Sequence, residues 1–348
     1  MLIYRWILSL RHRAYDRGSK KSFKSAVPSI CVGNVTVGGT GKTPFTEMLL
    51  RLLQDREGVA VLSRGYGRRT KGFLQVDPKG SAADFGDEPL QMARKFPERI
   101  VAVDKDRVAG CLKLKEMGSR CIILDDAFQY RRLKADLNIV LVNYSRPVFD
   151  DSLLPFGRLR DLPGRIFAAD IIVVSKCPED ITVQEKSAFA ERLHLKGYDI
   201  GDCTAVCPDG RKLKLLFSYI SYMEPVMVFP EGDHRYVYSK QIVMMSGIAE
   251  DARLEAHLRT SYKVQRKFAF ADHHTFSRSE LAKVENELRH SGAYAVATTE
   301  KDAQRLLSLP YVSDYLKSCL FYVPIETVLT SSAEREVLAE ELLVRIGE

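Results

Sequence analysis

The 348-residue sequence predicts an α/β fold, with a core in which helices flank a mostly parallel sheet and a smaller α/β domain joined to it by a β-ribbon. Three observations predict this. A glycine-rich turn directly follows an apolar run near residue 30, and short β-branched runs alternate with helical segments. Near residue 200 this alternation gives way to short strand-like pieces. Such alternation is typical of a parallel sheet that is covered by helices on both faces.

The glycine-rich turn lies between the apolar run 29–33 and a helical run at 45–53. It reads Thr36-Val37-Gly38-Gly39-Thr40-Gly41-Lys42-Thr43. Glycines let backbone N–H groups surround an anion, the next helix offers its positive N-terminus, Lys42 can reach the terminal phosphates and Thr43 can hold Mg²⁺. The turn therefore predicts a P-loop NTPase core. The pattern usually begins with glycine where this chain has Thr36, so a glycine-rich turn with an incidental lysine is the alternative.

The other elements follow in order. Further core strands are predicted at residues 59–63, 99–103, 121–124, 137–142 and 170–175. Beyond residue 204 the prediction is strand-like pieces at 226–229 and 236–238, strands at 241–246, 263–270 and 294–298, and helices at 251–260 and 279–290. The predicted divisions are an amphipathic basic segment (1–24), the P-loop core (25–200), a ribbon-like connection (201–240) and the smaller α/β domain (241–348).

The composition indicates an ordinary globular protein, with 45% hydrophobic and 28% charged residues. The seven cysteines are scattered and form no disulfide framework. Cys203 and Cys207 lie close together, but no second pair completes a zinc site, so we expect both to be buried or inert. A reducing, cytosolic setting follows.

The first 24 residues hold nearly the whole net charge of +7, since they include seven basic residues and only one acidic residue, Asp16. An apolar helical face precedes most of these charges and is formed by Leu2, Ile3, Trp6, Ile7 and Leu10. The stretch is too short to span a bilayer and carries no cleavage site for secretion. It predicts either an interfacial helix on an anionic membrane or a helix packed on the protein's own core.

Two aspartates, Asp125 and Asp126, follow the apolar run 121–124. An acidic residue at the end of a core strand is where a phosphate-loop enzyme helps to hold Mg²⁺. By itself such an aspartate is usually a turn residue. The upstream glycine loop favours the magnesium site.

A second acidic pair, Asp87 and Glu88, precedes Pro89. Proline suits the first turn of a helix, and acidic side chains stabilise a helix N-terminus. A positioned carboxylate could equally serve as the base that takes a proton from an attacking hydroxyl. The residues alone leave these two interpretations open.

The segment Asp272-His273-His274 follows a predicted strand. A full zinc ligand set at metal spacing is missing, so an imidazole that tunes a nearby acid is the better interpretation. A capping box of Ser277 and Glu280 explains part of the segment.

Arginines cluster beside glycines and turns in the loops 63–68, 104–107 and 155–161. Arginine's forked donors match phosphate and carboxylate oxygens. Singly, each of these arginines would usually form a surface salt bridge, but three such loops at strand ends favour a site for an anionic substrate.

Taken together, these segments resemble the tetraacyldisaccharide 4'-kinase family, the lipid A 4'-kinases of Gram-negative bacteria. The resemblance follows the chain in order from the basic amphipathic start through segments 32–44, 63–67, 86–89, 125–126, 154–157, 272–274 and 299–302. It implies a P-loop core and a smaller α/β domain joined by a ribbon, with the active site in the cleft between them. It also implies an ATP- and Mg²⁺-dependent transfer of the γ-phosphate to the 4'-hydroxyl of a tetraacyldisaccharide 1-phosphate in lipid A biosynthesis.

The resemblance assigns roles to individual residues. Asp87 is implied as the catalytic base, His273 as the histidine that tunes it and Lys42 as a catalytic cation. Residues 36–43 would bind ATP, and Thr43, Asp125 and Asp126 would hold the metal. The candidates for contact with the lipid substrate are Arg64, Tyr66, Glu88, Arg107, Gln129 and Arg160.

The implied partners are an anionic glycolipid and the inner-membrane lipid surface, with no nucleic acid. The implied location is the cytoplasmic face of the bacterial inner membrane, where the protein would be peripheral or monotopic.

The chain departs from the family pattern at two places. After the paired aspartates the family usually continues Gly-Leu-Gln-His, whereas this chain has Ala127-Phe128-Gln129-Tyr130, so Gln129 alone is carried over from that stretch. An extra residue, Leu162, precedes Pro163. The phosphate loop, both acidic pairs and the histidines are intact, which predicts a divergent but active member.

Two other nucleotide-binding classes are possible. A membrane-associated P-loop ATPase of the partner-switching type would carry a second lysine just before the double glycine, where this chain has Val37. A GTPase could use residues 175–178 to recognise guanine, but the aspartate that should follow Lys176 by two residues is missing. ATP is therefore favoured over GTP.

Overall fold

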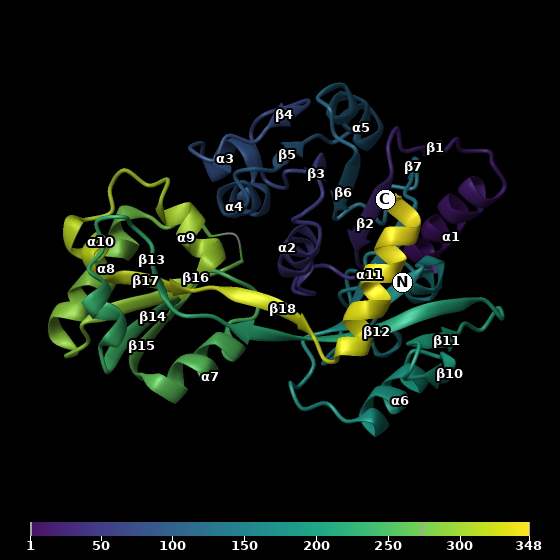
Figure 1. Cartoon of the computed structure of the whole chain (residues 1–348). Helices are drawn as coiled ribbons and strands as arrows, with labels where there is room; N and C mark the ends of the chain where they lie inside the picture. The colour runs from purple at the N-terminus through teal and green to yellow at the C-terminus, as the bar shows by residue number, and fades with distance from the viewer. Residues whose placement is uncertain (1, 273, 348) are drawn as a thin grey trace.

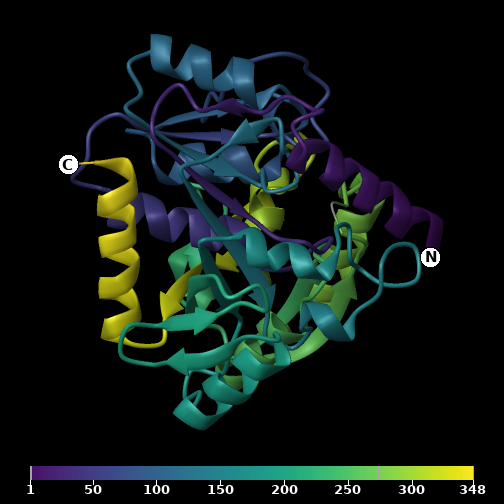
Figure 2. The ribbon, with the colours of Figure 1, turned by 90° about the vertical axis from the view of Figure 1, so that its right-hand side faces the viewer.

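The computed structural model of the protein describes residues 2–272 and 274–347, arranged as two α/β units with a two-stranded ribbon between them (Figure 1). The first and the last helix of the chain both pack on the first unit. Figure 2 shows the helices nearest the two ends, α1 (Leu2–Asp16) in purple and α11 (Ser332–Ile346) in yellow, on opposite sides of that unit.

The first unit is built on an 11-stranded sheet whose central strands are parallel. Every residue of β2, β3, β6 and β9 is buried, as expected for strands covered on both faces. The sheet order is β10-β11-β12-β9-β8-β2-β6-β3-β5-β4, and β18 pairs with β12. The strands are β2 (Ser29–Gly33), β3 (Val59–Ser63), β4 (Leu74–Gln75), β5 (Ile100–Val103), β6 (Cys121–Asp125), β8 (Leu137–Asn143), β9 (Ile171–Ser175), β10 (Lys196–Asp199), β11 (Thr204–Val206), β12 (Lys212–Tyr222) and β18 (Ile325–Leu329). The predicted P-loop type of α/β core is confirmed.

Helices cover both faces of this sheet, and a separate apolar cluster lies under each layer. One layer contains α1 (Leu2–Asp16), α5 (Arg107–Glu116) and α6 (Val183–Arg192). The opposite layer contains α2 (Lys42–Leu52), α4 (Asp87–Lys95) and α11 (Ser332–Ile346). Smaller elements complete the unit: β1 (Phe23–Lys24) paired with β7 (Leu133–Lys134), α3 (Ala82–Phe85), η1 (Val148–Asp150) and η2 (Pro163–Ala168). All seven cysteines of the protein are buried and free.

The second unit has a five-stranded sheet in the order β13-β17-β16-β14-β15. Its strands are β13 (Val226–Met227), β14 (Gln241–Ser246), β15 (Lys263–Ala269), β16 (Ala295–Thr299) and β17 (Leu320–Val323). Its helices are η3 (His234–Tyr238), α7 (Ala252–Ser261), α8 (Arg278–His290), α9 (Glu300–Leu306) and α10 (Asp314–Cys319). Two apolar clusters lie within it.

Strand β12 connects the units because it is long: its first part belongs to the sheet of the first unit, and its last part forms the ribbon between the units. Residues 214–217 pair in parallel with β9, and residues 218–222, past the segment paired with β9, pair antiparallel with β18. These two strands form the ribbon that runs between the two units in Figure 1. The ribbon therefore consists of segments more than a hundred residues apart in the sequence.

The structure differs from the sequence-based prediction in three places. Residues 236–238 lie in the 3₁₀ helix η3 rather than in a strand, because the Asp233 side chain caps that turn through the backbone N–H of Arg235. Residues 226–238 pack in the second unit rather than in a connection. Residues 325–346, predicted within the smaller domain, return to the first unit, because α11 buries Val337, Leu338, Leu342 and Ile346 against its core.

Helix α1 packs on the first unit by one face and exposes the other. Leu8 is buried in the core, and His12 Nε2 lies 2.6 Å from Asp161 Oδ1. The predicted apolar face points outward, with Ile3 76%, Trp6 63%, Ile7 52% and Leu10 41% exposed. Among the described residues, no helix has the length and apolar character needed to cross a membrane.

Candidate active site

The phosphate loop adopts a geometry that requires its glycines. Gly38, Gly39 and Gly41 have φ values of 73°, 53° and 78°, in the left-handed region where a side chain is strained. Helix α2 begins directly after Gly41, so its N-terminus opens into the loop. Thr36 instead makes an antiparallel bridge with Leu159, an extended conformation that any residue adopts. This explains why threonine is acceptable where the pattern usually has glycine.

Two neighbouring segments hold the loop in place. The backbone N–H of Val37 donates to Arg158 O at 2.8 Å, and Ser175 Oγ donates to Thr40 O at 2.8 Å. Asn34 Nδ2 donates to Thr40 Oγ1 at 2.7 Å, while Asn34 Oδ1 accepts from Arg160 at 2.6 Å. Asn34 is thus a site residue that the sequence analysis did not assign.

The paired aspartates at the end of β6 have different partners. Asp126 lies 3.6 Å from Lys42 Nζ and forms a two-pronged ion pair with Arg160. Burial alone would raise the pKa of Asp126, but Lys42 and Arg160 outweigh that effect and hold it below its usual range. Asp126 therefore carries a negative charge that the two basic side chains largely neutralise.

Asp125 is 1% exposed, and its Oδ2 accepts from Ser63 Oγ at 3.0 Å. Its Oδ1 is buried and makes no hydrogen bond within the described residues. Burial, and then the negative charges of Glu88 and Asp126, raise the pKa of Asp125 to about 7. A buried carboxylate oxygen of this kind fits a divalent cation, which supplies the missing positive charge.

The acidic pair at the start of α4 reaches across to α9 of the second unit. Arg305 donates to Asp87 Oδ2 at 2.6 Å and 3.0 Å, and Lys301 Nζ lies 2.9 Å from Glu88 Oε1. Burial alone would raise the pKa of Glu88, but Lys301 and Lys42 outweigh it and lower the pKa. Arg305 is held in turn by Asp302, at 2.7 Å. Lys301 and Arg305 had no predicted role.

The segment around residue 272 contributes to the same region. Asp272 lines the cavity described below, and its charge helps to raise the pKa values of Lys301 and Arg305 against the effect of burial. His274 Nε2 lies 3.0 Å from Glu280 Oε2, and the predicted capping box of Ser277 and Glu280 is present. The proposed tuning residue, His273, lies outside the described residues.

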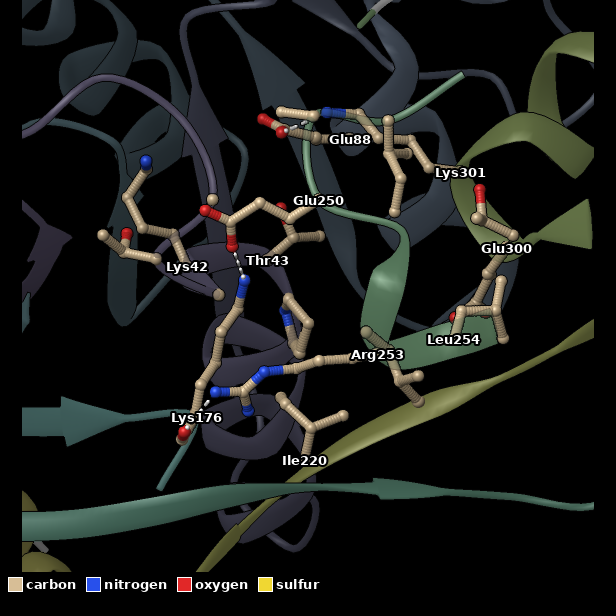
Figure 3. A pocket seen from close by; sticks show the side chains of 18 of the residues that line it. Lys42, Thr43, Glu88, Lys176, Ile220, Glu250, Arg253, Leu254, Glu300 and Lys301 are labelled. Atoms are coloured by element: carbon tan, nitrogen blue, oxygen red, sulfur yellow. Dashed lines mark hydrogen bonds and ion pairs between the residues drawn. The ribbon is translucent and has the colours of Figure 1, made fainter. Parts of the chain in front are cut away.

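A cavity of about 220 Å³ lies between the phosphate loop, the ribbon and the second unit. Figure 3 shows its polar wall, with Lys42 and Thr43 on one side and Glu88, Lys301 and Glu250 around them. Its apolar wall includes Ile220, Leu254, Val323 and Ile325. A groove with a phosphate loop at one end and apolar side chains at the other suits a nucleotide.

Of the six predicted lipid-contacting residues, Glu88 belongs to the acidic pair described above, and the other five fall into three groups. Gln129 and Arg160 lie together beside Asn34, because Gln129 Nε2 donates to the Asn34 carbonyl oxygen. Arg64 and Tyr66 are exposed on the loop after β3. Arg107 is 3% exposed and donates to the carbonyls of residues 104 and 105.

Arg107 thus supports the loop at residues 104–106, and burial lowers its pKa even though Asp125 and Asp126 act against that effect. Among the described residues, no group of three or more His, Cys, Asp and Glu side chains is arranged to hold a metal ion.

Known proteins are similar to this chain over nearly all of its length. The model of the tetraacyldisaccharide-1-P 4'-kinase family matches residues 1–343. The tetraacyldisaccharide 4'-kinase of Bacteroides fragilis is 39% identical over 339 residues, which cover 94% of this chain and 86% of that protein. The protein of the same name from Phocaeicola vulgatus is 38% identical over 327 residues, or 91% of this chain and 86% of that protein.

A solved structure agrees with these sequence relatives. The crystal structure of LpxK from Aquifex aeolicus in complex with ATP superposes with a TM-score of 0.72 at 29% identity, covering 99% of this chain and 96% of that one. The comparisons support the kinase rather than the partner-switching ATPase or the GTPase. The chain belongs to the tetraacyldisaccharide-1-P 4'-kinase family.

Proposed function

We propose that the protein is an ATP-dependent kinase that phosphorylates the 4'-hydroxyl of a tetraacyldisaccharide 1-phosphate, in lipid A biosynthesis. One observation carries this proposal beyond family membership. The phosphate loop with Lys42 lines the same cavity as Glu88, the neighbour of Asp87 at the start of α4, and Lys301 and Arg305 of the second unit bind this acidic pair from the other side. Donor and acceptor groups can therefore meet there.

ATP is the proposed donor. Its phosphates would rest in the loop at residues 36–43, where backbone N–H groups, the N-terminus of α2 and Lys42 favour negative charge. Its base would lie against Ile220, Leu254, Val323 and Ile325. Lys42 is already near the negative charge of Asp126 at 3.6 Å, so its ammonium group points to the place where the metal and phosphates would gather.

Magnesium is the proposed metal cofactor, and the donor set fits it. Thr43 follows the loop lysine, and Asp125 offers a buried oxygen without a hydrogen bond among the described residues. Mg²⁺ usually takes one or two protein oxygens and completes its shell with phosphates and water, where it neutralises charge on the phosphates. Asp126 is assigned to Lys42 and Arg160 instead, because both of its oxygens are engaged.

Asp87 is the proposed catalytic base. As the acceptor oxygen attacks the γ-phosphorus, its proton passes to Asp87, and ADP departs with the electrons of the broken P–O bond. Arg305 contacts a single carboxylate oxygen of Asp87, Oδ2, which orients the group. Glu88 and Lys301 hold the neighbouring wall of the cavity together.

The acceptor is proposed to arrive from a lipid surface. The exposed apolar face of α1 would lie in the membrane interface on the cytoplasmic side of the inner membrane, with the basic residues up to Lys24 near anionic headgroups. The same helix contacts the site, since Tyr4 OH donates to Arg160 O at 3.1 Å and Arg11 donates to Gln129 O at 2.8 Å. Arg64, Tyr66, Gln129 and Arg160 are the proposed contacts for the anionic glycolipid, and two of them, Gln129 and Arg160, are bound by this helix.

The deciding experiment is a phosphoryl-transfer assay. Purified protein is incubated with γ-labelled ATP, Mg²⁺ and a tetraacyldisaccharide 1-phosphate in mixed micelles. We expect a doubly phosphorylated lipid that carries the label. Label released only as inorganic phosphate, at a rate independent of the lipid, would contradict the proposal and favour an ATPase.

A further inference from the structure

A carboxylate of the second unit occupies the mouth of the phosphate loop. Glu250 lies in the loop between β14 and α7, and its Cδ would be 3.4 Å from a Cβ atom placed on Gly39. Figure 3 shows this side chain beside Lys42, with its interaction with Lys176 drawn as a dashed line. An acidic group at this position is unexpected, because the loop and the N-terminus of α2 favour an anionic ligand.

Three basic side chains of the first unit hold that carboxylate. Lys176 Nζ lies 3.1 Å from Glu250 Oε2, and the guanidinium groups of Arg146 and Arg158 lie 3.2 Å and 3.5 Å from Oε1. They come from three separate segments, after β8, from the loop at residues 155–161 and after β9. Convergence of three segments on one anion indicates a built anion site rather than a chance surface pair.

Two of the segments that carry these cations are hydrogen-bonded to the phosphate loop. The backbone of Arg158 accepts from Val37, and Ser175, next to Lys176, donates to Thr40. Lys176 also has a left-handed backbone with a φ of 60°, which is uncommon for lysine. The loop and the cations therefore form one anion-binding surface.

The charges at this surface do not balance. One carboxylate faces three cations, whereas Lys42 already has Asp126. Burial alone would raise the pKa of Glu250, but Lys176 and the two arginines outweigh it, so the group stays ionised at neutral pH. A phosphate group, with more charge and more acceptor oxygens than a carboxylate, matches three cations better.

We propose that Glu250 is an internal stand-in for a nucleotide phosphate group, and that Arg146, Arg158 and Lys176 bind the phosphates of ATP once Glu250 leaves. This inference rests on the proposed function and deepens it. Glu250 thereby competes with the nucleotide, and displacing it frees the segment between β14 and α7 to move relative to the loop. The pairs can be exchanged because the side chains of Arg146 and Arg158 are each 43% exposed.

The opposite role for Glu250 is a latch that holds the two units together around bound ATP. The two roles predict opposite changes in ATP affinity when Glu250 is replaced. A competitor lowers apparent affinity by reducing the competent fraction of the protein, so its removal tightens ATP binding. Removal of a latch weakens ATP binding, as removal of its lysine partner also would.

The test measures dissociation constants of the full-length protein for a non-hydrolysable ATP analogue, ADP and adenosine by titration calorimetry. The variants are Glu250→Gln, Lys176→Met and the double variant, with Glu231→Gln as the control because Glu231 is a 58% exposed glutamate of the second unit with a lysine partner. Glu250→Gln should tighten binding of the analogue and ADP by about threefold to tenfold, and Lys176→Met should weaken it by a similar factor. Binding of adenosine should not change, since it has no phosphate.

Unchanged or weaker analogue binding in Glu250→Gln would overturn the proposal. If Lys176→Met does not fold, as judged by circular dichroism, Arg158→Gln replaces it with the same expectation. A wild-type protein that binds ATP and phosphorylates the lipid while Glu250→Gln fails to tighten would refute the stand-in alone. A wild-type protein that does neither would refute the proposed function itself.

Discussion

The two walls of the cavity are built in different ways. On the first wall, residues 36–43 and the end of β6 owe their shape to backbone geometry, with three left-handed glycines and a helix N-terminus. On the second wall, Glu250, Lys301 and Arg305 owe their positions to ion pairs with side chains of the first unit. The contacts that hold the first wall lie within the first unit, whereas the second wall depends on how the two units meet.

We infer from this difference that the two walls have different functions. A wall defined by backbone geometry keeps its shape whether or not the units close, so it suits a nucleotide that must bind reproducibly. A wall held by ion pairs can exchange partners, because partly exposed pairs contribute little each. Changes on the first wall should therefore abolish chemistry or nucleotide binding, and changes on the second should shift affinities and coupling.

The largest effect is expected where the two walls meet, at Asp87. Replacement of Asp87 by asparagine removes the proposed proton acceptor, and a positioned base contributes about 10²–10⁴ in rate. We expect kcat to fall by that factor while ATP affinity changes little, because the base acts as the hydroxyl loses its proton. Steady-state kinetics and analogue binding measure the two quantities, with Glu98→Gln at a 61% exposed glutamate as the control. Lost ATP binding with normal turnover of the bound fraction would remove Asp87 from that role.

The next effect tests the backbone-defined wall. Lys42→Ala and Thr43→Ala each remove a group that would stabilise charge on the transferring phosphate, and loss of one such donor costs about 10²–10³ in kcat. Lys115→Ala, an exposed lysine of α5, serves as the control. Single-turnover assays at saturating ATP report the chemical step. Wild-type rates in both variants would place the nucleotide site elsewhere.

How far the sequence could predict each wall follows from the same difference. The glycine loop, β6 and its aspartates are local features, in which neighbours in the sequence create the geometry, and their positions were predicted. Arg305 and Glu250 carry no local pattern, because their partners lie 218 residues away at Asp87 and 74 residues away at Lys176. No periodicity or motif encodes such a distant pairing.

The prediction for residues 325–346, which was that they belong to the smaller domain, was wrong for a related reason. Helix α11 has an apolar face like that of any amphipathic helix, and nothing in the face itself tells which core it covers. The decisive feature is the pairing of β18 with the outer half of β12, which carries the chain back to the first unit. The resemblance to a known family supplied the two-unit architecture but not that connection.

A smaller effect separates the two aspartates of the first wall. Asp125→Asn should lower activity by about 10- to 100-fold at low Mg²⁺, the usual cost of disturbing a metal site, and activity should partly return at high Mg²⁺. Asp126→Asn should not respond to Mg²⁺, because its carboxylate serves Lys42 and Arg160. Activity measured against Mg²⁺ concentration distinguishes them. Equal rescue of both variants would show that the two carboxylates share the metal.

The smallest effect concerns α1, where the contrast between buried and exposed positions recurs within one helix. Deletion of residues 2–24 would be a poor test, because Leu8 and His12 are buried and loss of the helix would uncover the core. The combined substitution Ile3→Ser, Trp6→Ser and Ile7→Ser alters the exposed face alone. Burial of such side chains is worth about 1.5–3 kcal/mol each when complete, and an interfacial helix buries them in part.

We expect the triple variant to raise KM for the lipid acceptor in anionic vesicles about tenfold, with ATP affinity and melting temperature unchanged. Val344→Ser is the matched control, since Val344 is 77% exposed and belongs to α11, the helix on the opposite side of the first unit from α1 (Figure 2). Vesicle sedimentation over a range of salt concentrations separates the electrostatic from the hydrophobic contribution to membrane binding. Salt weakens the contribution of the basic residues and not that of the apolar face. A triple variant that sediments like the wild-type protein at moderate salt would move the membrane contact to another surface. A variant with a lower melting temperature would show that this face also stabilises the fold.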